Sequence, residues 1–182
     1  MLKVVHRGSF HATGSGSATA IIGAAAGLIR CTNLSLFSDA VGTLKFYLAN
    51  AVTTSGAALA AGTGLSINTD SEGKVAGAVL TTNDYVIIAD SSGTGYQLRS
   101  ISNVADVSDD KVTLTLGASA TCASGDEVFV VRAADIISRA TTDDEATTDA
   151  KDQFNGYFKM PVAVVVTATG TDEVSGTYDV ER

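Results

Sequence analysis

The residues that could do chemistry in this chain are few, and their spacing does not suit a catalytic site. Histidine is the usual general base near neutral pH, and the chain has only His6 and His11, both near the N-terminus. A spacing of five does not place two residues on one face of a strand or a helix, and zinc would need further ligands nearby. Both histidines are therefore interpreted as surface or core residues.

Carboxylates are concentrated in one polar segment. Paired carboxylates are enough for glycoside hydrolysis when they flank the substrate, but here they share a short stretch, and the chain has no Trp to stack on a sugar. Their spacing does not match an EF-hand calcium loop. The segment is interpreted as a solvated acidic loop, with calcium binding as the alternative. Its carboxylates are Asp143, Asp144, Glu145, Asp149 and Asp152.

Motifs for phosphate binding and nucleophilic catalysis are incomplete. Gly73-Lys74 lacks the earlier glycine of a P-loop, since that position is Asn68. The run Gly14–Ser17 is rich in glycine but lacks the context of a strand followed by a helix, so it is interpreted as a flexible linker. No Gly-x-Ser-x-Gly elbow occurs. The sequence therefore predicts a chain that is not an enzyme, with no catalytic residues, no cofactor and no metal site.

Composition and charge restrict the partners. The chain has 182 residues, 45% of them hydrophobic but only 6% aromatic, so Val, Ile, Leu and Ala must fill the core. Charged residues make up 18%, with a formal net charge of −8, and the low charge with many β-branched residues is typical of a packed β protein. This acidic balance predicts no binding to nucleic acid and none to anionic membranes.

Two cysteines are too few for a disulfide framework. Cys31 and Cys122 are interpreted as buried free thiols of a protein made in a reducing cytoplasm, with a Cys31–Cys122 disulfide as the alternative.

The apolar stretch Ala18–Ile29 is broken by Gly23 and Gly27 and is too short to span a bilayer. It is interpreted as buried structure or a close-packed interface.

Runs of alternating apolar residues recur along the chain and predict strands. The run 85–89 is continuously apolar, which indicates a strand buried on both faces. Turn signals at 90–93, Asn155-Gly156 and 170–172 separate the runs, and Pro161 places its own strand at an edge or a bulge. The alternating runs are residues 44–48, 112–116, 158–166 and 174–180.

These signals predict an all-β fold with a β-sandwich or a jelly-roll or barrel-like body. A helix start signal occurs at Thr142, with Glu145 three residues later. The segment 142–153 is predicted to be a short helix or a mobile acidic loop, and the sequence does not decide between them.

A weak internal repeat suggests a substructure. Asn83-Asp84 before one apolar run echoes Gly125-Asp126 before another, each a turn residue and an Asp ahead of a strand. The alternative is that this is simply a common way to begin a strand. The predicted organisation is a single all-β domain over residues 1–182, with a small inserted β module over 73–133.

The order of strands in residues 83–132 resembles that of small β modules in tailed-phage virion proteins. It reads Asp-Tyr-Val-Ile-Ile, Gly-Tyr-Gln-Leu-Arg-Ser-Ile, Lys-Val-Thr-Leu-Thr-Leu and Gly-Asp-Glu-Val-Phe-Val-Val. The whole chain, rich in Gly, Ala and Thr, acidic and free of Trp, is similar to phage capsid decoration (cement) proteins. That resemblance implies no catalytic residues, self-association as a homotrimer, and a position on the outer capsid surface, clamping neighbouring subunits of the major capsid protein.

The predicted function is therefore a non-enzymatic virion protein that stabilises a phage capsid, made in the host cytoplasm. A phage tail, neck or receptor-binding module is the alternative, and a hydrolase of cell-wall polymer is a third hypothesis. Residues 1–17 are predicted to be an extended N-terminal arm, because Leu2, Val4 and Val5 form a short strand ahead of the glycine-rich run. This arm is expected to bind a neighbouring chain or the capsid by strand addition, with those three residues as the partner-binding residues.

Overall fold

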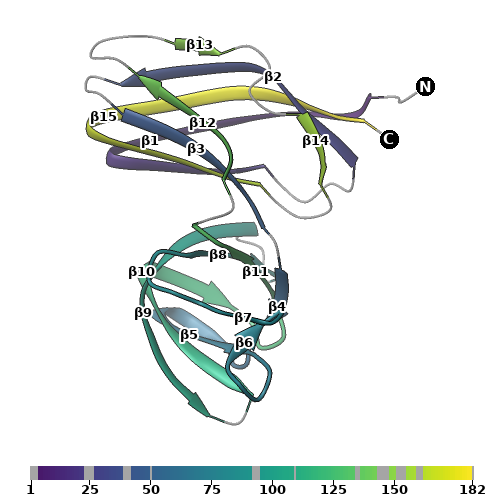
Figure 1. Ribbon diagram of the computed structural model, residues 1–182, viewed down its shortest axis with the longest axis vertical. Helices are drawn as coiled ribbons and strands as arrows, with labels where there is room; N and C mark the ends of the chain where they lie inside the picture. Colours follow the sequence, from purple (N-terminus) through teal and green to yellow (C-terminus); the bar gives the residue numbers. More distant parts are fainter. Residues whose placement is uncertain are drawn as a thin grey trace. The chain divides into compact units, whose positions relative to one another are not determined.

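The structure is a computed structural model, and it describes residues 4–22, 27–38, 42–49, 51–91, 95–108, 110–133, 136–142, 148–150, 155–158 and 162–181. Side chains are described chiefly in the central part of the chain, over residues 51–91, 95–105 and 110–133. The chain divides into two compact units (Figure 1). One comprises residues 1–48 and 136–182, and the other comprises residues 49–135.

Every regular element in the described residues is a strand, so the predicted all-β fold is confirmed. The segment 142–153 was expected to be a helix or a loop, and its described part is neither. Thr142 ends β12 (Ile136–Thr142), and Thr148–Ala150 form β13. The physical reason is that helices in proteins are stabilised mainly by packing an apolar face, which this segment lacks, while its threonines favour extended backbone.

The unit 49–135 is a closed antiparallel barrel. Six strands follow one another in the order β4-β11-β8-β9-β10-β5, and a bridge between Ser55 and Ile67 joins the end of β4 to β5. Figure 1 shows these strands wrapped into a ring. The predicted barrel-like body is therefore present. The strands are β4 (Ala51–Thr54), β5 (Leu59–Asn68), β8 (Tyr85–Asp90), β9 (Gly95–Ser108), β10 (Lys111–Cys122) and β11 (Glu127–Val131).

A two-stranded hairpin accompanies the barrel. It joins β6 (Lys74–Val75) to β7 (Ala78–Val79) through Ala76 and Gly77. Both turn residues have positive φ, 49° and 78°, as a type I′ hairpin turn requires. Arg132 donates a hydrogen bond at 3.0 Å to the carbonyl of Val75, which ties the hairpin to the end of β11.

The barrel interior confirms the predicted alternation. On β10, Val112, Leu114 and Leu116 are buried, whereas Thr113 and Thr115 are not. The strand predicted at residues 85–89 is β8, which pairs antiparallel with β9. The three central residues of β8 are fully buried, as expected for a strand covered on both faces. The core includes Leu65, Ile67, Val86, Ile88, Ile101, Val112, Leu114, Leu116, Val128 and Val130.

The other unit is organised by a long two-stranded ribbon. β1 (Val4–Ile22) runs antiparallel along one side of β15 (Val162–Glu181) over the length of both, as the purple and yellow strands of Figure 1 show. The opposite side of β15 pairs first with β3 (Gly42–Leu48) and then with β2 (Gly27–Ser38). β12 continues the sheet beyond β3, while β13 and β14 (Asn155–Phe158) flank β2.

Three sequence interpretations are wrong in this unit, and glycine explains each of them. The run Gly14–Ser17 is part of β1 and not a linker, and residues 170–172 lie within β15 and not in a turn. The pairing register shifts between Ser15 and Ser17, because glycine within a strand often marks a bulge. Asn155-Gly156 likewise begins β14 and does not turn. Pro161 lies outside the described residues.

The register gives this sheet one apolar and one polar face. Even-numbered residues of β15 such as Val164 and Val174 are opposite Ala20 and Ala12 of β1. Odd-numbered positions are mostly polar, as at Thr177 opposite Ser9. Because residues directly opposite one another share a face, the predicted alternating runs on β3 and β15 fit this pairing.

Candidate interaction sites

The predicted partner-binding residues lie at the start of β1. Val4 is opposite Glu181 of β15, and a register shift follows between Val4 and His6, at Val5. Leu2 lies outside the described residues. Residues 4–17, expected to be an arm, are extended but pair with β15 of their own chain. Binding of a neighbour by these residues stays a prediction.

The other edge of β1 has no partner strand among the described residues. In the described part of the chain, β1 is paired with β15 and with no other strand. With 19 residues and a rise near 3.3 Å per residue, this open edge is about 60 Å long. An edge presents unpaired N–H and C=O groups, which can accept a further strand.

Three charged residues of β1, β15 and β2 occupy one cross-strand row. Asp179 of β15 is opposite Arg7 of β1 on one side and opposite Arg30 of β2 on the other. The first 38 residues contain no Asp or Glu, whereas β15 has four acidic residues, Asp172, Glu173, Asp179 and Glu181. Opposite charges in directly paired positions stabilise a sheet modestly, so the pairing register of β1 and β2 with β15 is favoured electrostatically.

Two aspartates of the barrel occupy equivalent positions in two turns. The amide of Asp84 donates to the carbonyl of Thr81 at 3.1 Å, and that of Asp126 to the carbonyl of Ala123 at 3.3 Å. The carboxylates accept in return from the amides of Thr81 at 2.8 Å and Ala123 at 2.7 Å. Each aspartate therefore fixes the turn that leads into a strand, β8 or β11.

The same carboxylates also hold the end of the neighbouring strand. Asp84 accepts from the amide of Ala133 at 3.0 Å, just beyond β11, and Asp126 accepts from the amide of Ser91 at 3.2 Å, just beyond β8. Because β8 and β11 are antiparallel neighbours, the start of each strand lies beside the end of the other. Asp84 and Asp126, which we call the aspartate latches, are thus related by a pseudo-twofold axis.

The sequence contained the signal for these latches. Both aspartates belong to the weak repeat, in which a turn residue and an Asp precede an apolar run. What the repeat could not show is that both carboxylates are buried, with exposed fractions of 6% and 8%. Their second partners, Ala133 and Ser91, come from the opposite copy of the repeat, which only the pairing of β8 with β11 brings close.

The burial of Cys122 does not favour thiol chemistry. Burial raises the pKa of this free thiol, and the nearby carboxylates of Asp126 and Asp90 add to the effect. A protonated thiol is a poor nucleophile. Hydrogen bonds, the largest from the Ser91 side chain, hold the pKa of Asp126 below its ordinary value. Asp126 therefore stays ionised near neutral pH and acts as an acceptor.

Side chains complete the barrel where backbone pairing ends. β10 pairs with β9 only from Lys111 to Leu116. Beyond that point, the Gln97 side chain donates to the Thr121 carbonyl at 2.8 Å and accepts from the Thr121 amide at 3.1 Å. Arg99 donates to the Ser119 carbonyl at 2.8 Å. These polar groups join the two strands.

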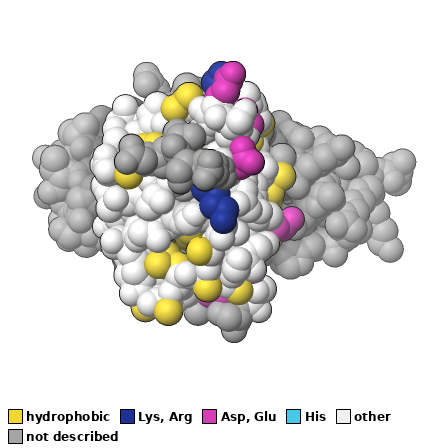
Figure 2. Space-filling model, turned by 90° about the horizontal axis from the view of Figure 1, so that it is seen from below, with side chains coloured by type: hydrophobic (Ala, Val, Ile, Leu, Met, Phe, Trp, Pro, Cys, Tyr) yellow, Lys and Arg dark blue, Asp and Glu magenta, His cyan; other side chains and the backbone are white. Residues whose placement is uncertain are grey.

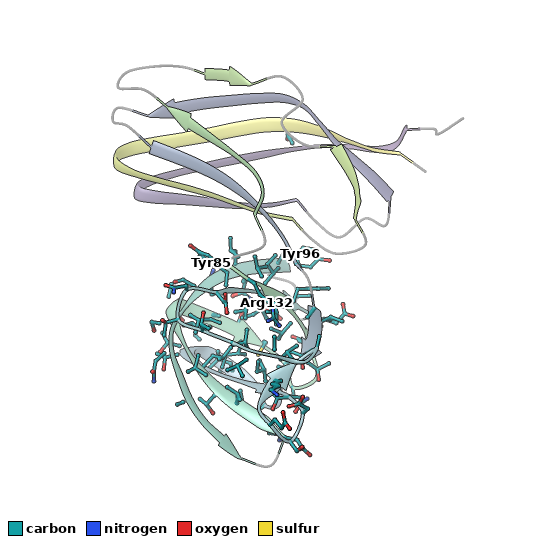
Figure 3. All side chains as sticks on the ribbon, in the orientation of Figure 1. Tyr85, Tyr96 and Arg132 are labelled. Carbon is teal, nitrogen blue, oxygen red and sulfur yellow. The ribbon has the colours of Figure 1, made fainter. Side chains whose placement is uncertain are left out.

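Few large apolar residues are exposed on the described barrel. The three large ones among the described residues are Val52, Val79 and Tyr96, with exposed fractions of 47%, 55% and 40%. Tyr96, labelled in Figure 3, has its ring 6.3 Å from that of Phe129. Figure 2 shows one face on which hydrophobic side chains form small separate patches between polar ones and backbone. Charged side chains of both signs lie among them.

The remaining candidate residues are only partly placed. His6 and His11 lie on β1 and Asp149 lies on β13, and the other four acidic candidates lie outside the described residues. Where side chains are described, no group of three His, Cys, Asp or Glu residues could hold a metal ion. No described helix is long and apolar enough to cross a membrane.

Comparison with known proteins gives weak similarity to phage capsid proteins. No protein-family model and no curated protein matches the chain. VP17, a capsid protein of bacteriophage P23-77, is 13% identical over 100% of this chain and 99% of its own, with a TM-score of 0.23. The VP16–VP17 complex of the two major capsid proteins of the same phage gives 14% identity, coverage of 96% and 100%, and a TM-score of 0.26. Scores this low do not establish a common fold or function.

Proposed function

We propose that this chain is a structural protein of a phage virion that decorates the capsid and stabilises it by binding across neighbouring subunits of the major capsid protein. The sequence resemblance to decoration proteins suggests this role. The proposal that the chain is not an enzyme is supported by the hydrogen bonds of its buried polar side chains. The four buried polar side chains of the described barrel, Ser55, Asp84, Asp90 and Asp126, all have hydrogen bonds within the barrel.

This use of buried groups is characteristic of a scaffold. Catalytic groups are directed toward a substrate and have pKa values tuned for proton transfer. Here the Asp126 pKa is lowered by structural hydrogen bonds and the Cys122 pKa is raised by burial, which are the directions expected of groups that stay in one protonation state. The proposed role is therefore binding through the surface, on the outside of the virion, after synthesis in the host cytoplasm.

Binding is proposed to depend mainly on apolar burial and backbone hydrogen bonds. Charged residues are only 18% of the chain, so ion pairs contribute little and attachment should depend only mildly on salt. A ligand that binds only the assembled shell stabilises it by mass action, and many symmetric contacts add through multivalency. Association of the chain with itself, as a homotrimer, is part of the proposal.

The decisive experiment measures the rupture temperature of purified particles with and without the protein, at low and high salt. We expect a higher rupture temperature in its presence at both salt concentrations. Equal temperatures would remove the cement role and favour a tail, neck or receptor-binding module. The copy number per particle separates the same two functions, since hundreds of copies indicate the capsid and a few indicate the tail.

The proposed N-terminal contact is best tested with a short deletion that leaves β1 intact. Leu2, Val4 and Val5 are proposed to contact the neighbouring chain or the capsid. Residues 4–12 pair with β15, so deleting residues 1–12 would also remove a strand from the sheet. Deleting residues 1–3 preserves the described strand, and weaker particle attachment with unchanged unfolding would support the contact.

A further inference from the structure

We propose that the open edge of β1 pairs antiparallel with β1 of a second copy of this chain, forming a continuous sheet across a twofold axis. This inference rests on the self-association in the proposed function and specifies its geometry. It concerns the whole of Val4–Ile22, and not only the residues at its N-terminal end.

The first argument is that β1 lacks the features that usually protect an edge strand. Proteins blunt such edges with Lys, Pro, short strands or a covering segment. β1 is 19 residues long and contains no Pro and no Lys, and Arg7 is its sole residue with a permanent charge. Its register shifts beside Val5 and Gly16 leave the segment between them regularly paired with β15. An edge of this kind is expected to be covered in the working state of the protein.

The second argument identifies the occupant by length. Within the sheet as described, open edges also occur on β12, β13 and β14, which have 7, 3 and 4 residues. None of these could cover an edge of 19 residues. β15 is long enough, with 20 residues, but has neighbours on both sides. The strand that matches in length and also has a free edge is another β1.

The third argument sets the direction. Parallel pairing in register would place Arg7 beside the same residue of the second copy. Antiparallel pairing over the full strand places it opposite Thr19 of the partner subunit and separates the two arginines by about twelve residues, or roughly 40 Å. Like charges in direct opposition destabilise a sheet, so the antiparallel arrangement is favoured. It is also isologous, so it closes as a pair and does not extend into a fibre.

A twofold contact of this kind joins two copies directly, or two trimers through three equivalent contacts that leave no β1 edge open. It therefore predicts particles of two or six chains, with a chain mass of 18.5 kDa. Analytical ultracentrifugation over a wide concentration range measures this. A protein that stays monomeric, or that stops at a trimer, at all accessible concentrations contradicts the inference.

Proline substitutions at the centre of β1 give the most direct test of the twofold contact. Ala12 and Thr13 are adjacent and pair with Val174 and Glu173 of β15. Amides alternate in direction along a strand, so one of the two donates toward β15 and the other toward the open edge. Proline removes a donor. One of Ala12→Pro and Thr13→Pro should therefore keep cooperative unfolding and weaken the twofold contact at least tenfold, while the other also damages the fold. If each of the two proline variants that folds still forms the twofold contact, the proposal is refuted.

A second variant avoids proline altogether. Thr13 lies at the centre of β1, so full antiparallel overlap would place it opposite Thr13 of the partner subunit. Thr13→Lys would bring two positive charges together there, while Glu173 at the paired position of β15 helps the folded monomer to tolerate the change. We expect weaker association that recovers at high salt. The control Thr177→Lys adds the same charge on β15, one strand away from the edge, and should leave association unchanged. Equal effects of the two variants would overturn the proposal.

Amide hydrogen exchange on the unmodified protein shows which strand pairs with the open edge of β1. Protection of the outward amides of β1 should increase with protein concentration in the absence of particles. Protection that appears only when capsid is added would replace the second copy with a capsid strand. The rupture-temperature experiment is independent of this outcome. Stabilised particles with a monomeric protein refute only the β1 contact, whereas twofold pairing without particle stabilisation refutes only the cement role.

Discussion

The barrel and the sheet that contains the β1–β15 ribbon, which we call the ribbon sheet, are both antiparallel. They differ in whether their edge strands are paired. The barrel joins β4 to β5 through the Ser55–Ile67 bridge, and its side chains Gln97 and Arg99 bridge the place where β9 and β10 separate. The ribbon sheet, by contrast, leaves β1 paired on one side in the described structure. A closed ladder is a self-sufficient fold, while an open one is suited to assembly. We therefore expect the barrel to contribute mainly to stability, whereas the proposed association involves the ribbon.

The largest expected effect tests the register of the ribbon. Val164→Asp should abolish folding of this unit, because it places a charge on the apolar face, opposite Ala20 and Phe46. A charge placed without a partner among apolar residues costs several kcal/mol. Val165→Asp is the matched control, since it lies on the other face, opposite Thr19 and Lys45. Circular dichroism and soluble yield should separate the two, and equal damage from both would contradict the assigned faces.

The next effect tests whether the barrel depends on its latches. Asp84→Ala leaves the amides of Thr81 and Ala133 without their acceptor. Hydrogen bonds to a charged group contribute about 1.5–3 kcal/mol, so we expect a loss of about 2–4 kcal/mol in the free energy of unfolding by denaturant.

Asp126→Ala should cost a similar amount, because its contacts are equivalent. The control is Asp70→Ala, which removes an exposed carboxylate that accepts from the amides of Glu72 and Lys74. Its expected cost is below about 1 kcal/mol, since solvent can replace the lost acceptor. A control as costly as the latch variants would show that burial is not the source of their strength.

A smaller effect concerns the stability of the barrel at acidic pH. The pKa of Asp126 is lower in the folded protein, so its contribution to stability is complete above the unfolded pKa of about 3.9. It is lost as the pH falls through the lower folded value. Unfolding free energies between pH 7 and pH 2 should therefore decrease below about pH 4. Asp126→Asn should flatten part of that decrease, and an unchanged acid dependence in this variant would count against the latch.

The smallest effect is an expected absence of change. Asp144→Asn alters a carboxylate that the sequence places in a solvated acidic segment with no assigned chemical role, and substitutions in such segments usually change stability by less than about 0.5 kcal/mol. Unfolding and particle attachment should both match the unmodified protein. A loss of attachment would give the acidic segment a role in binding.

Periodicity predicted the strands well where burial follows it. Val112, Leu114 and Leu116 alternate in sequence and in exposure, and the continuous run in β8 is buried on both faces. Glycine was the source of error. Gly14 and Gly16 suggested a linker, but pairing with β15 keeps this stretch extended, and local sequence does not reveal a partner strand more than 150 residues away.

The interaction sites were less predictable for the same reason. Val4 and Val5 were identified from a local apolar run, while the open edge depends on which side of β1 is covered by β15. The latches depend on pairing between strands that begin 42 residues apart. The repeat pointed to the correct aspartates, yet their partners Ser91 and Ala133 are ordinary in sequence. Information of this kind lies in the topology and not in the pattern of residue types.

The aspartate latches also have a consequence for how the barrel is made. Each carboxylate fixes the start of its own strand through a local turn and the end of the other strand through a distant contact. The local halves can form as soon as each turn has been synthesised, but the distant halves exist only once β8 and β11 have met. Contacts that are distant in sequence generally slow folding. The pairing of these two strands is therefore expected to be a late, all-or-none step, in which both ends are secured together and neither strand can fray without releasing the other.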